Sequence, residues 1–353
     1  MKLNPIILLL FFLPQSLLAQ TLAPVAAQET FQELIKKDLI FPNLKLIRLR
    51  NSWGKVFVHG WAQEKIRIQM TRFTKAETSE EAQERFKEVV LHSQENSGTV
   101  EIIIRIGKSF SISERIQARE KRKVKIDLEV WLPQNIPFAL STKDDEAQVD
   151  NYIGEIDMWS QFGALTINNI TSSEIMLNCV KCQINVSKSE IKKIDIYGGE
   201  GEFNLSHLKI DKLYFEGQKG NLEVSNIFGN QTYLLKNGKL KGTDLSGEIY
   251  FKSENTDIDL KNIEGTVSGK NGQGNINLDV KKWITKSGFI QTRSGNINLF
   301  LPTDNKIELD LASQQGKVKV DEGFYGFLNK KNHDNTSLLK VKTWSGQIYV
   351  KKR

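Results

Sequence analysis

The sequence is poor in the residues that build most catalytic and metal sites. Its 353 residues include two cysteines and four histidines. The histidines form no HExxH motif and no pair at helical spacing, so the sequence does not indicate a metal hydrolase. It also has no G-x-S-x-G elbow and no phosphate-binding loop, and Gly272-Gln273-Gly274 fits a turn rather than a dinucleotide loop. We therefore expect no metal and no cofactor.

Long apolar segments are confined to the N-terminus. Residues 1–19 combine an early lysine, an apolar stretch and a small residue before Gln20, which is the pattern of a secretory signal peptide. No cysteine lies near the cleavage region, which disfavours a lipid anchor. No later segment approaches the ~20 apolar residues of a transmembrane helix. We expect an exported protein without a transmembrane segment, located in the periplasm, at the cell surface or in the medium.

The formal net charge is +7 at pH 7, and part of this excess is local. Arg119, Lys121, Arg122 and Lys123 crowd one stretch that we expect to be an exposed loop. Such a loop could contact an anionic surface of acidic polysaccharide or lipid head groups, although an ordinary solvated surface is the alternative. Because the chain is expected to be exported, we do not expect nucleic acid as a partner.

Cys179 and Cys182 are the only cysteines and bracket a predicted turn. Residues three apart in a β-turn have Cα atoms less than ~7 Å apart, within reach of disulfide geometry. An exported protein would keep such a pair oxidised, so we predict a disulfide. Free thiols remain an alternative, as does a redox or metal role, although two thiolates fall short of the four ligands that zinc prefers.

From about residue 156 to the C-terminus the chain repeats one short unit. Two apolar residues lie two and four places after a sharp turn, as in Ile276 and Leu278, and two more lie seven and five places before it. Such pairs predict two short strands with the same face inward. A period near 20 residues is typical of a solenoid. The residues at the turns are Gly163, Cys182, Gly201, Gly220, Gly238, Thr256, Gly274, Gly295, Gly316 and Gly346.

We therefore predict an all-β protein, a two-sheet β-solenoid or β-roll of about ten short coils. The alternative is an ordinary β-sandwich whose apolar residues match the repeat by chance. Gly269 and Gly288 replace apolar residues at inward positions, where they would make room for a bulge or a large neighbour. We expect a signal peptide over 1–19, a cap over 20–135 and the solenoid over 136–353.

The predicted cap is a small α+β region. Residues 29–39 suit a short amphipathic helix. Thr78 and Glu81 form a capping box, which predicts a helix that continues to about Leu91 and buries Phe86, Val89 and Val90. The remaining segments of this region alternate as strands do.

The sequence resembles a bacterial β-strand-repeat family of unknown function whose members are candidate adhesins. The matching segments are residues 51–61 and 130–133, together with the Ser-Gly-x-Ile turns at 246–249, 294–297 and 345–348. The resemblance implies an all-β, solenoid-like fold at the cell envelope without established catalytic residues. The sequence departs from the family pattern in two places. Cys182 stands where other units have glycine, and an insertion lies between Gly316 and Gly346.

The two predicted sheets differ in their outward residues. On the strands that follow the turns, the outward residues are mostly small or polar. On the strands that precede the turns, several outward residues are large and apolar. Such a face either packs against another part of the chain or binds something. We expect the N-terminal third to cover it or, alternatively, a glycan or protein partner to bind there. The candidate ligand-binding residues are Trp159, Tyr197, Tyr214, Tyr250 and Phe289.

These patterns favour a non-catalytic, adhesin-like envelope protein that binds a polymer or a protein partner. A β-helix-type polysaccharide lyase or hydrolase is the alternative, and it would need clustered carboxylates with a basic residue in a groove. Asp257 and Asp259 are the carboxylates that we weighed for this role, but their predicted neighbours favour charge pairing along a sheet. A third interpretation is an assembly element that extends by edge pairing, which the charged tail at residues 351–353 disfavours.

Overall fold

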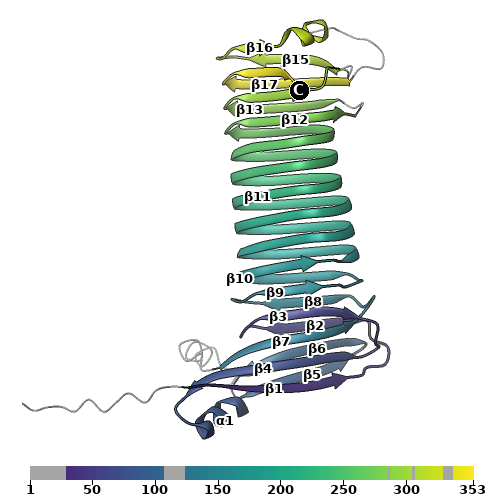
Figure 1. Cartoon of the computed structure of the whole chain (residues 1–353), viewed down its shortest axis with the longest axis vertical. Helices are drawn as coiled ribbons and strands as arrows, with labels where there is room; N and C mark the ends of the chain where they lie inside the picture. The colour runs from purple at the N-terminus through teal and green to yellow at the C-terminus, as the bar shows by residue number, and fades with distance from the viewer. Residues whose placement is uncertain (1–28, 107–123, 285–286, 304–306, 329–336) are drawn as a thin grey trace, which may run out of the picture.

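The computed structural model describes residues 29–106, 124–284, 287–303, 307–328 and 337–353. The protein is nearly all β-structure and forms a tall stack of coils, which confirms the expected β-solenoid-like architecture (Figure 1). The predicted signal peptide and the basic residues from Arg119 to Lys123 lie outside the described residues. Within the described residues, no helix has the length and apolar character to cross a membrane.

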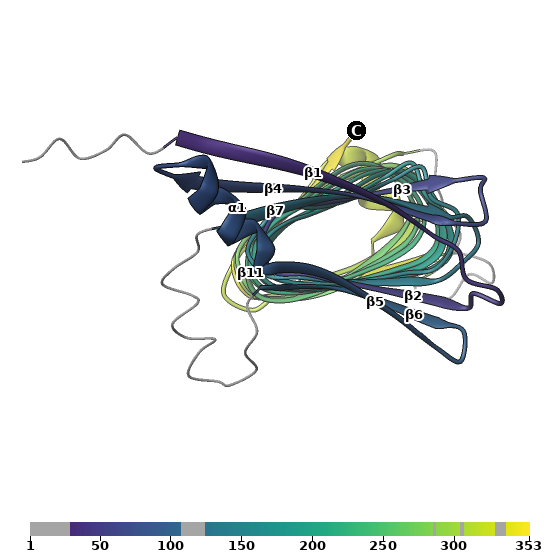
Figure 2. The same cartoon turned by 90° about the horizontal axis from the view of Figure 1, so that it is seen from below.

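Two facing sheet layers make up the stack and enclose a flattened oval when seen along its axis (Figure 2). Strand β10 (Ile156–Asn168) pairs in parallel with β11 (Thr171–Gln273), which winds continuously through the central coils. Ile156 lies beside Ile175 in one layer, and Leu165 lies beside Ile184 in the other. Each coil therefore adds one strand to each layer, at the ~4.8 Å spacing of paired strands.

The inward apolar pairs are buried almost throughout, as the period-2 pattern predicts. Ile276 and Leu278 are examples from β12 (Ile276–Trp283). The small inward residues accommodate large neighbours, because a Cβ at Gly269 would overlap the ring of Phe251. A Cβ at Gly288 would likewise overlap Trp283. The glycines are thus part of the packing of the core.

One inward pair is polar and internally satisfied. The Tyr233 hydroxyl is fully buried and donates a hydrogen bond to Oε1 of Gln231 at 2.6 Å. Nε2 of Gln231 donates in turn to the carbonyl oxygens of Gly229 and Ser246, both at 3.1 Å. Because each of these buried polar atoms has a hydrogen-bond partner, the polar pair does not add the desolvation cost of an unsatisfied group to this coil.

The coils at the N-terminal end do not stack in chain order. Strands β2 and β3 lie between the pair β6/β7 and the pair β8/β9, and they run parallel to both. Strand β5 then covers β6, and β4 followed by β1 covers β7, all in antiparallel pairing. The bounds are β1 Glu29–Leu39, β2 Leu46–Asn51, β3 Val56–Trp61, β4 Ile66–Ala76, β5 Val89–Asn96, β6 Thr99–Ile106, β7 Val124–Pro133, β8 Phe138–Thr142 and β9 Ala147–Asp150.

The predicted helix over residues 29–39 is wrong, because this segment is strand β1. It pairs with β4 along its whole length, from Glu29 beside Ala76 to Leu39 beside Ile66. Its more protected residues, Phe31, Ile35 and Leu39, fall at every fourth position. A spacing of four fits one face of a helix and equally one face of a strand, so the pattern alone could not decide.

The N-cap at Thr78 is confirmed, with Glu81 Oε2 accepting from the backbone N–H of Glu77 at 3.0 Å, but the helix is shorter than predicted. The backbone N–H of Glu81 donates to Oγ1 of Thr78 at 3.2 Å, and helix α1 spans Ser79–Lys87 with Phe86 buried. Val89 and Val90 belong to strand β5 instead, with Val89 buried and Val90 exposed. Adjacent residues with opposite burial are what a strand produces.

The C-terminal end also departs from chain order. Strands β17 and β18 lie between the pair β13/β14 and the pair β15/β16, so the coil at residues 307–320 ends the stack. Val318 is the register partner of the buried Ile348 but is itself 40 % exposed in this end coil, and Leu311 is only partly buried. The 3-10 helix η1 (Glu322–Phe327) follows this coil and buries Phe324. The strand bounds are β13 Gly288–Ser294, β14 Ile297–Leu301, β15 Ile307–Ser313, β16 Val318–Val320, β17 Ser337–Ser345 and β18 Ile348–Lys352.

Candidate functional site

The five aromatic residues predicted to contact a ligand lie on one sheet layer and point outward. Trp159 belongs to β10, Tyr197, Tyr214 and Tyr250 belong to β11, and Phe289 belongs to β13. Both sequence neighbours of each of these residues are buried. Strand alternation therefore directs the five rings away from the core. We call this surface the aromatic face.

The rings gather in two clusters. Tyr197 and Tyr214, on neighbouring coils, have ring centroids 5.7 Å apart, and Tyr250 and Phe289 have centroids 6.4 Å apart. Both separations lie in the range of favourable aromatic pairs. Trp159 makes no ring contact with the other four among the described residues. The structure thus brings the predicted residues together as two pairs and one separate tryptophan.

The aromatic face is open among the described residues. Trp159 is 41 % exposed and Tyr197 is 39 % exposed. The expectation that the N-terminal third covers this face does not hold for its described strands, which lie at one end of the stack (Figure 1). Tyr214, Tyr250 and Phe289 are half-buried. All five rings keep some surface on one sheet layer that a partner could contact.

Tyr214 carries the polar anchor of the first cluster. Its hydroxyl donates a hydrogen bond to Oε2 of Glu216 at 2.7 Å. This bond favours the neutral phenol and raises the pKa of Tyr214 to about 12. The hydroxyl therefore stays protonated at neutral pH, and Glu216 holds the ring in a defined orientation beside Tyr197.

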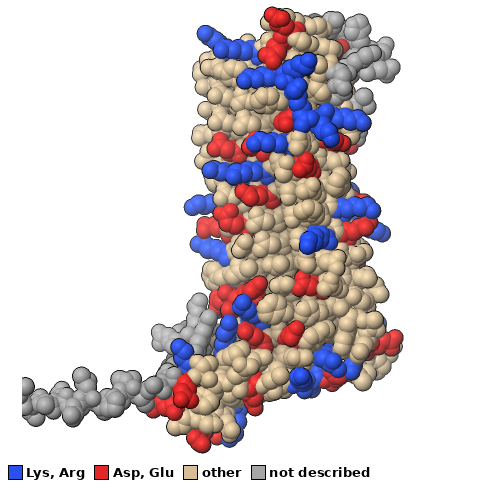
Figure 3. Space-filling model, in the orientation of Figure 1, with Lys and Arg blue, Asp and Glu red and all other residues tan. Residues whose placement is uncertain are grey.

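A groove of about 1050 Å³ lies at the turns of the coils that carry Tyr250 and Phe289 and of their neighbouring coils. Lys252, Lys270, Lys342 and Arg293 line it together with Trp344, whose side chain is 56 % exposed. We call this surface the basic groove. Lys and Arg side chains also gather near the C-terminal end of the face drawn in Figure 3.

Sequence reasoning missed the basic groove, although its signal was present. Lys252, Lys270 and Lys342 each stand four places before the turn of their unit, and Gln291 holds the same position between them. A comparison of equivalent positions across coils would have found this column.

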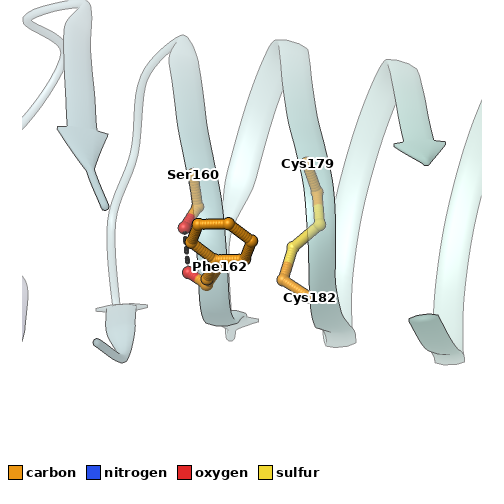
Figure 4. The surroundings of a disulfide bond; sticks show 4 residues. All are labelled: Ser160, Phe162, Cys179 and Cys182. Atoms are coloured by element: carbon orange, nitrogen blue, oxygen red, sulfur yellow. Dashed lines mark hydrogen bonds between the residues drawn. A yellow bond between two sulfur atoms is a disulfide. The ribbon is translucent and has the colours of Figure 1, made fainter. Parts of the chain in front are cut away.

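Cys179 and Cys182 lie across a turn between the two layers and are joined through their sulfur atoms, with Cα atoms 6.0 Å apart (Figure 4). The preceding coil ties the same turn differently, since Ser160 Oγ donates to the carbonyl oxygen of Phe162 at 2.5 Å. Ser160 is the register partner of Cys179. The cysteine pair thus occupies a position where neighbouring coils use a side-chain hydrogen bond.

The carboxylates weighed for catalysis are held in structural contacts. Asp257 Oδ1 accepts a hydrogen bond from the backbone N–H of Asn275 at 3.0 Å. Asp259 forms an ion pair with Lys261 at 3.0 Å. Among the described residues, no three His, Cys, Asp or Glu side chains are grouped so that they could hold a metal ion.

The C-terminal coils of the stack are the part of this chain that matches a known protein family. Residues 238–351 match the model of the Toastrack DUF4097 family. This match confirms the resemblance to a β-repeat family of unknown function, over the C-terminal part of the stack. No curated protein matches the sequence.

Two solved structures are similar to the chain over most of its length. One is a candidate cell adhesion protein from Clostridium sporogenes, with 11 % identity, a TM-score of 0.21, and coverage of 91 % of this chain and 100 % of that one. The other is a candidate adhesin from Bacteroides fragilis, with 13 % identity, a TM-score of 0.27, and coverage of 90 % and 97 %.

Proposed function

We propose that the protein is a non-catalytic, adhesin-like component of the cell envelope or surface that binds a polymer or protein partner through its aromatic face. The observation that carries the proposal is the set of outward rings on one layer of a rigid stack. Aromatic rings supply contact area at a low cost in conformational entropy, and their faces suit sugar rings. The predicted signal peptide and the adhesin names of the similar structures agree with an exported protein of this kind.

A direct test is the binding of the purified chain from Gln20 onward to a panel of envelope and host glycans. A variant with Trp159, Tyr197 and Tyr214 changed to alanine should lose binding, because it removes two exposed rings and one half-buried ring without touching the core. The matched control changes Phe300 and Tyr349, which point outward on the opposite layer, to alanine. We expect this control to bind as the wild type does.

Two outcomes would contradict the proposal. Equal binding by the wild type and by the folded aromatic variant would exclude the aromatic face as the ligand surface. A fall in polymer length during incubation would contradict the non-catalytic part and favour a polysaccharide lyase or hydrolase. Circular dichroism spectra should be the same for all variants, since none of the altered side chains is buried.

A further inference from the structure

We propose that the basic groove binds an acidic polysaccharide, a polymer whose sugar rings carry carboxylates. The inference deepens the proposed function and rests on it in one respect, namely that this sheet layer faces a polymer. It concerns different residues from those of the aromatic face. The two surfaces are continuous, because Nζ of Lys270 lies 5.6 Å from the ring centroid of Phe289.

The charge of the groove suits an anion. Lys252, Lys270, Arg293 and Lys342 are exposed, and none forms an ion pair with another described residue. Glu254 is the one acidic residue among the described side chains that line the groove. Elsewhere in the stack, neighbouring coils pair opposite charges, as in Lys209 with Glu190 at 2.7 Å. The groove therefore carries positive charge without a partner in this part of the structure.

The spacing of the charge distinguishes between kinds of polyanion. Four successive coils at the groove each supply one cation, so a cation recurs at each ~4.8 Å step between paired strands. Arg293 lies two places further along its strand than the column of lysines. Duplex DNA carries one negative charge per ~1.7 Å, a much denser array than the groove could neutralise. A polysaccharide with one carboxylate per ring has a repeat comparable with the spacing between coils. Charge complementarity thus favours the glycan.

The floor of the groove is held in a fixed conformation. Nδ2 of Asn271 donates to the carbonyl oxygens of Thr256 at 2.7 Å and Gly274 at 3.3 Å. In the next coil, Oγ1 of Thr292 donates to the carbonyl oxygen of Ser294 at 3.2 Å. These bonds order the turns that present Lys270 and Arg293 before any ligand arrives, which lowers the cost of binding.

The remaining lining suits hydroxyl groups and ring faces. Besides Asn271, whose amide holds the floor, five amide side chains line the groove, and each can donate and accept hydrogen bonds, as sugar hydroxyls require. Trp344 offers an exposed indole ring next to Arg293, since their strands pair in register. Stacking on a ring beside a cation is a common way to hold a charged sugar. The amides are Asn237, Asn255, Gln273, Gln291 and Gln314.

The test measures binding of the chain from Gln20 onward to polygalacturonate, with neutral dextran as the uncharged probe. A variant with Lys270, Arg293 and Lys342 changed to glutamine should bind polygalacturonate about tenfold more weakly, from three exposed charge contacts. Binding by the wild type should weaken as salt rises, because exposed charge pairs are screened. A loss of less than twofold would overturn the inference.

The matched control removes three exposed cations from the opposite layer by changing Lys239, Lys317 and Lys319 to glutamine. It should bind polygalacturonate as the wild type does, and an equal loss in the control would overturn the inference by showing that only net charge matters. A thymidine oligonucleotide that bound more tightly than polygalacturonate at equal charge concentration would also overturn it.

A further arm separates this inference from the proposed function. The variant of Trp159, Tyr197 and Tyr214 leaves the groove intact. Polygalacturonate binding that survives in this variant but falls in the groove variant would support the inference even if the aromatic face bound nothing. Binding lost in both would support it as one extended surface. Binding lost only in the aromatic variant would overturn it and leave the proposed function standing.

Discussion

Two valines that the repeat places at inward positions should differ sharply in their contribution to stability. Val350 is 1 % exposed because its coil is covered on both sides, whereas Val318 is 40 % exposed in the coil that ends the stack. Replacement by alanine removes the equivalent of two methylene groups, about 1.6 kcal/mol of transfer free energy at a fully buried site. The cavity left at Val350 adds to this loss. We expect about 2–3 kcal/mol for Val350→Ala and less than about 1 kcal/mol for Val318→Ala.

Urea unfolding followed by far-ultraviolet circular dichroism measures both values from the shift in midpoint at a common slope. If coils stacked in chain order, residues 307–320 would lie inside the stack, and Val318 would be covered as Val350 is. Equal losses for the two variants would therefore refute the arrangement of the C-terminal coils. A change in slope for one variant would show that its coil unfolds separately.

Cross-linking gives an independent check of the order in which the C-terminal coils stack. Asn298 and Tyr349 are register partners on adjacent strands, about 4.8 Å apart, whereas Lys319 lies one strand further, about 10 Å from Asn298. In a chain with Cys179→Ser and Cys182→Gly, a short thiol cross-linker should join N298C to Y349C and should not join N298C to K319C. The reverse result would place the coil of Lys319 next to β14.

Further predictions concern single positions. A hydrogen bond to Glu216 favours the neutral phenol, so the pKa of Tyr214 is about 12 in the folded protein, above the unfolded value of ~10. The stabilisation from this hydrogen bond is therefore complete below pH ~10 and is lost as pH rises through 12. The difference in ultraviolet titration between wild type and Tyr214→Phe should show this, and a transition near pH ~10 would contradict it. Reduction of the Cys179–Cys182 pair should lower the free energy of unfolding by about 2 kcal/mol or less, since the closed loop is short. Mass spectrometry that found free thiols in the exported protein would contradict the disulfide. Gly269→Ala should destabilise by about 1–3 kcal/mol because its Cβ would overlap Phe251, and an unchanged melting temperature would contradict the packing.

The inward positions of the repeat could be predicted because strand geometry and close coil packing leave few choices. Period-2 apolar pairs on both sides of a turn define which face is buried, and residues such as Ile276 and Ile297 lie where this rule puts them. The turn glycines follow from the same geometry. Gly295 has φ +132°, and a Cβ there would overlap the carbonyl of Gly274 in the adjacent coil.

The order of the coils could not be predicted, because a periodic pattern states what each coil looks like and not which coil lies beside it. Residues 307–320 and 337–352 carry the same inward pattern, yet the later segment lies deeper in the stack. Segment 29–39 failed for a related reason, since its spacing of four suited two structures. In both cases, pairing with strands that are distant in the sequence determines the structure.

The candidate site was predicted in part for the same reason as the core. Alternation along a strand placed Tyr197 and Tyr214 outward, and adjacent coils brought them into contact. The basic groove depends on which turns lie next to each other, and its C-terminal wall comes from β17. Lys342 and Trp344 meet Gln291 and Arg293 only because β17 is inserted beside β13. Chain order would have placed the coil of residues 307–320 there.

The same insertions bear on the interpretation of the chain as an assembly element that grows by edge pairing. The charged tail does not guard the end of the stack, because β18 is an inner strand and Nε of Arg353 pairs with Asp279 at 2.6 Å. Among the described residues, strand β16 ends that layer instead, with three residues, and η1 follows it. At the other end, antiparallel β5 and β4 cover the edges to which a parallel coil would add. Short end strands and reversed pairing both oppose the addition of another copy. The ends that break the repeat therefore favour a stack of defined length, in agreement with the proposal that a partner binds on its lateral faces.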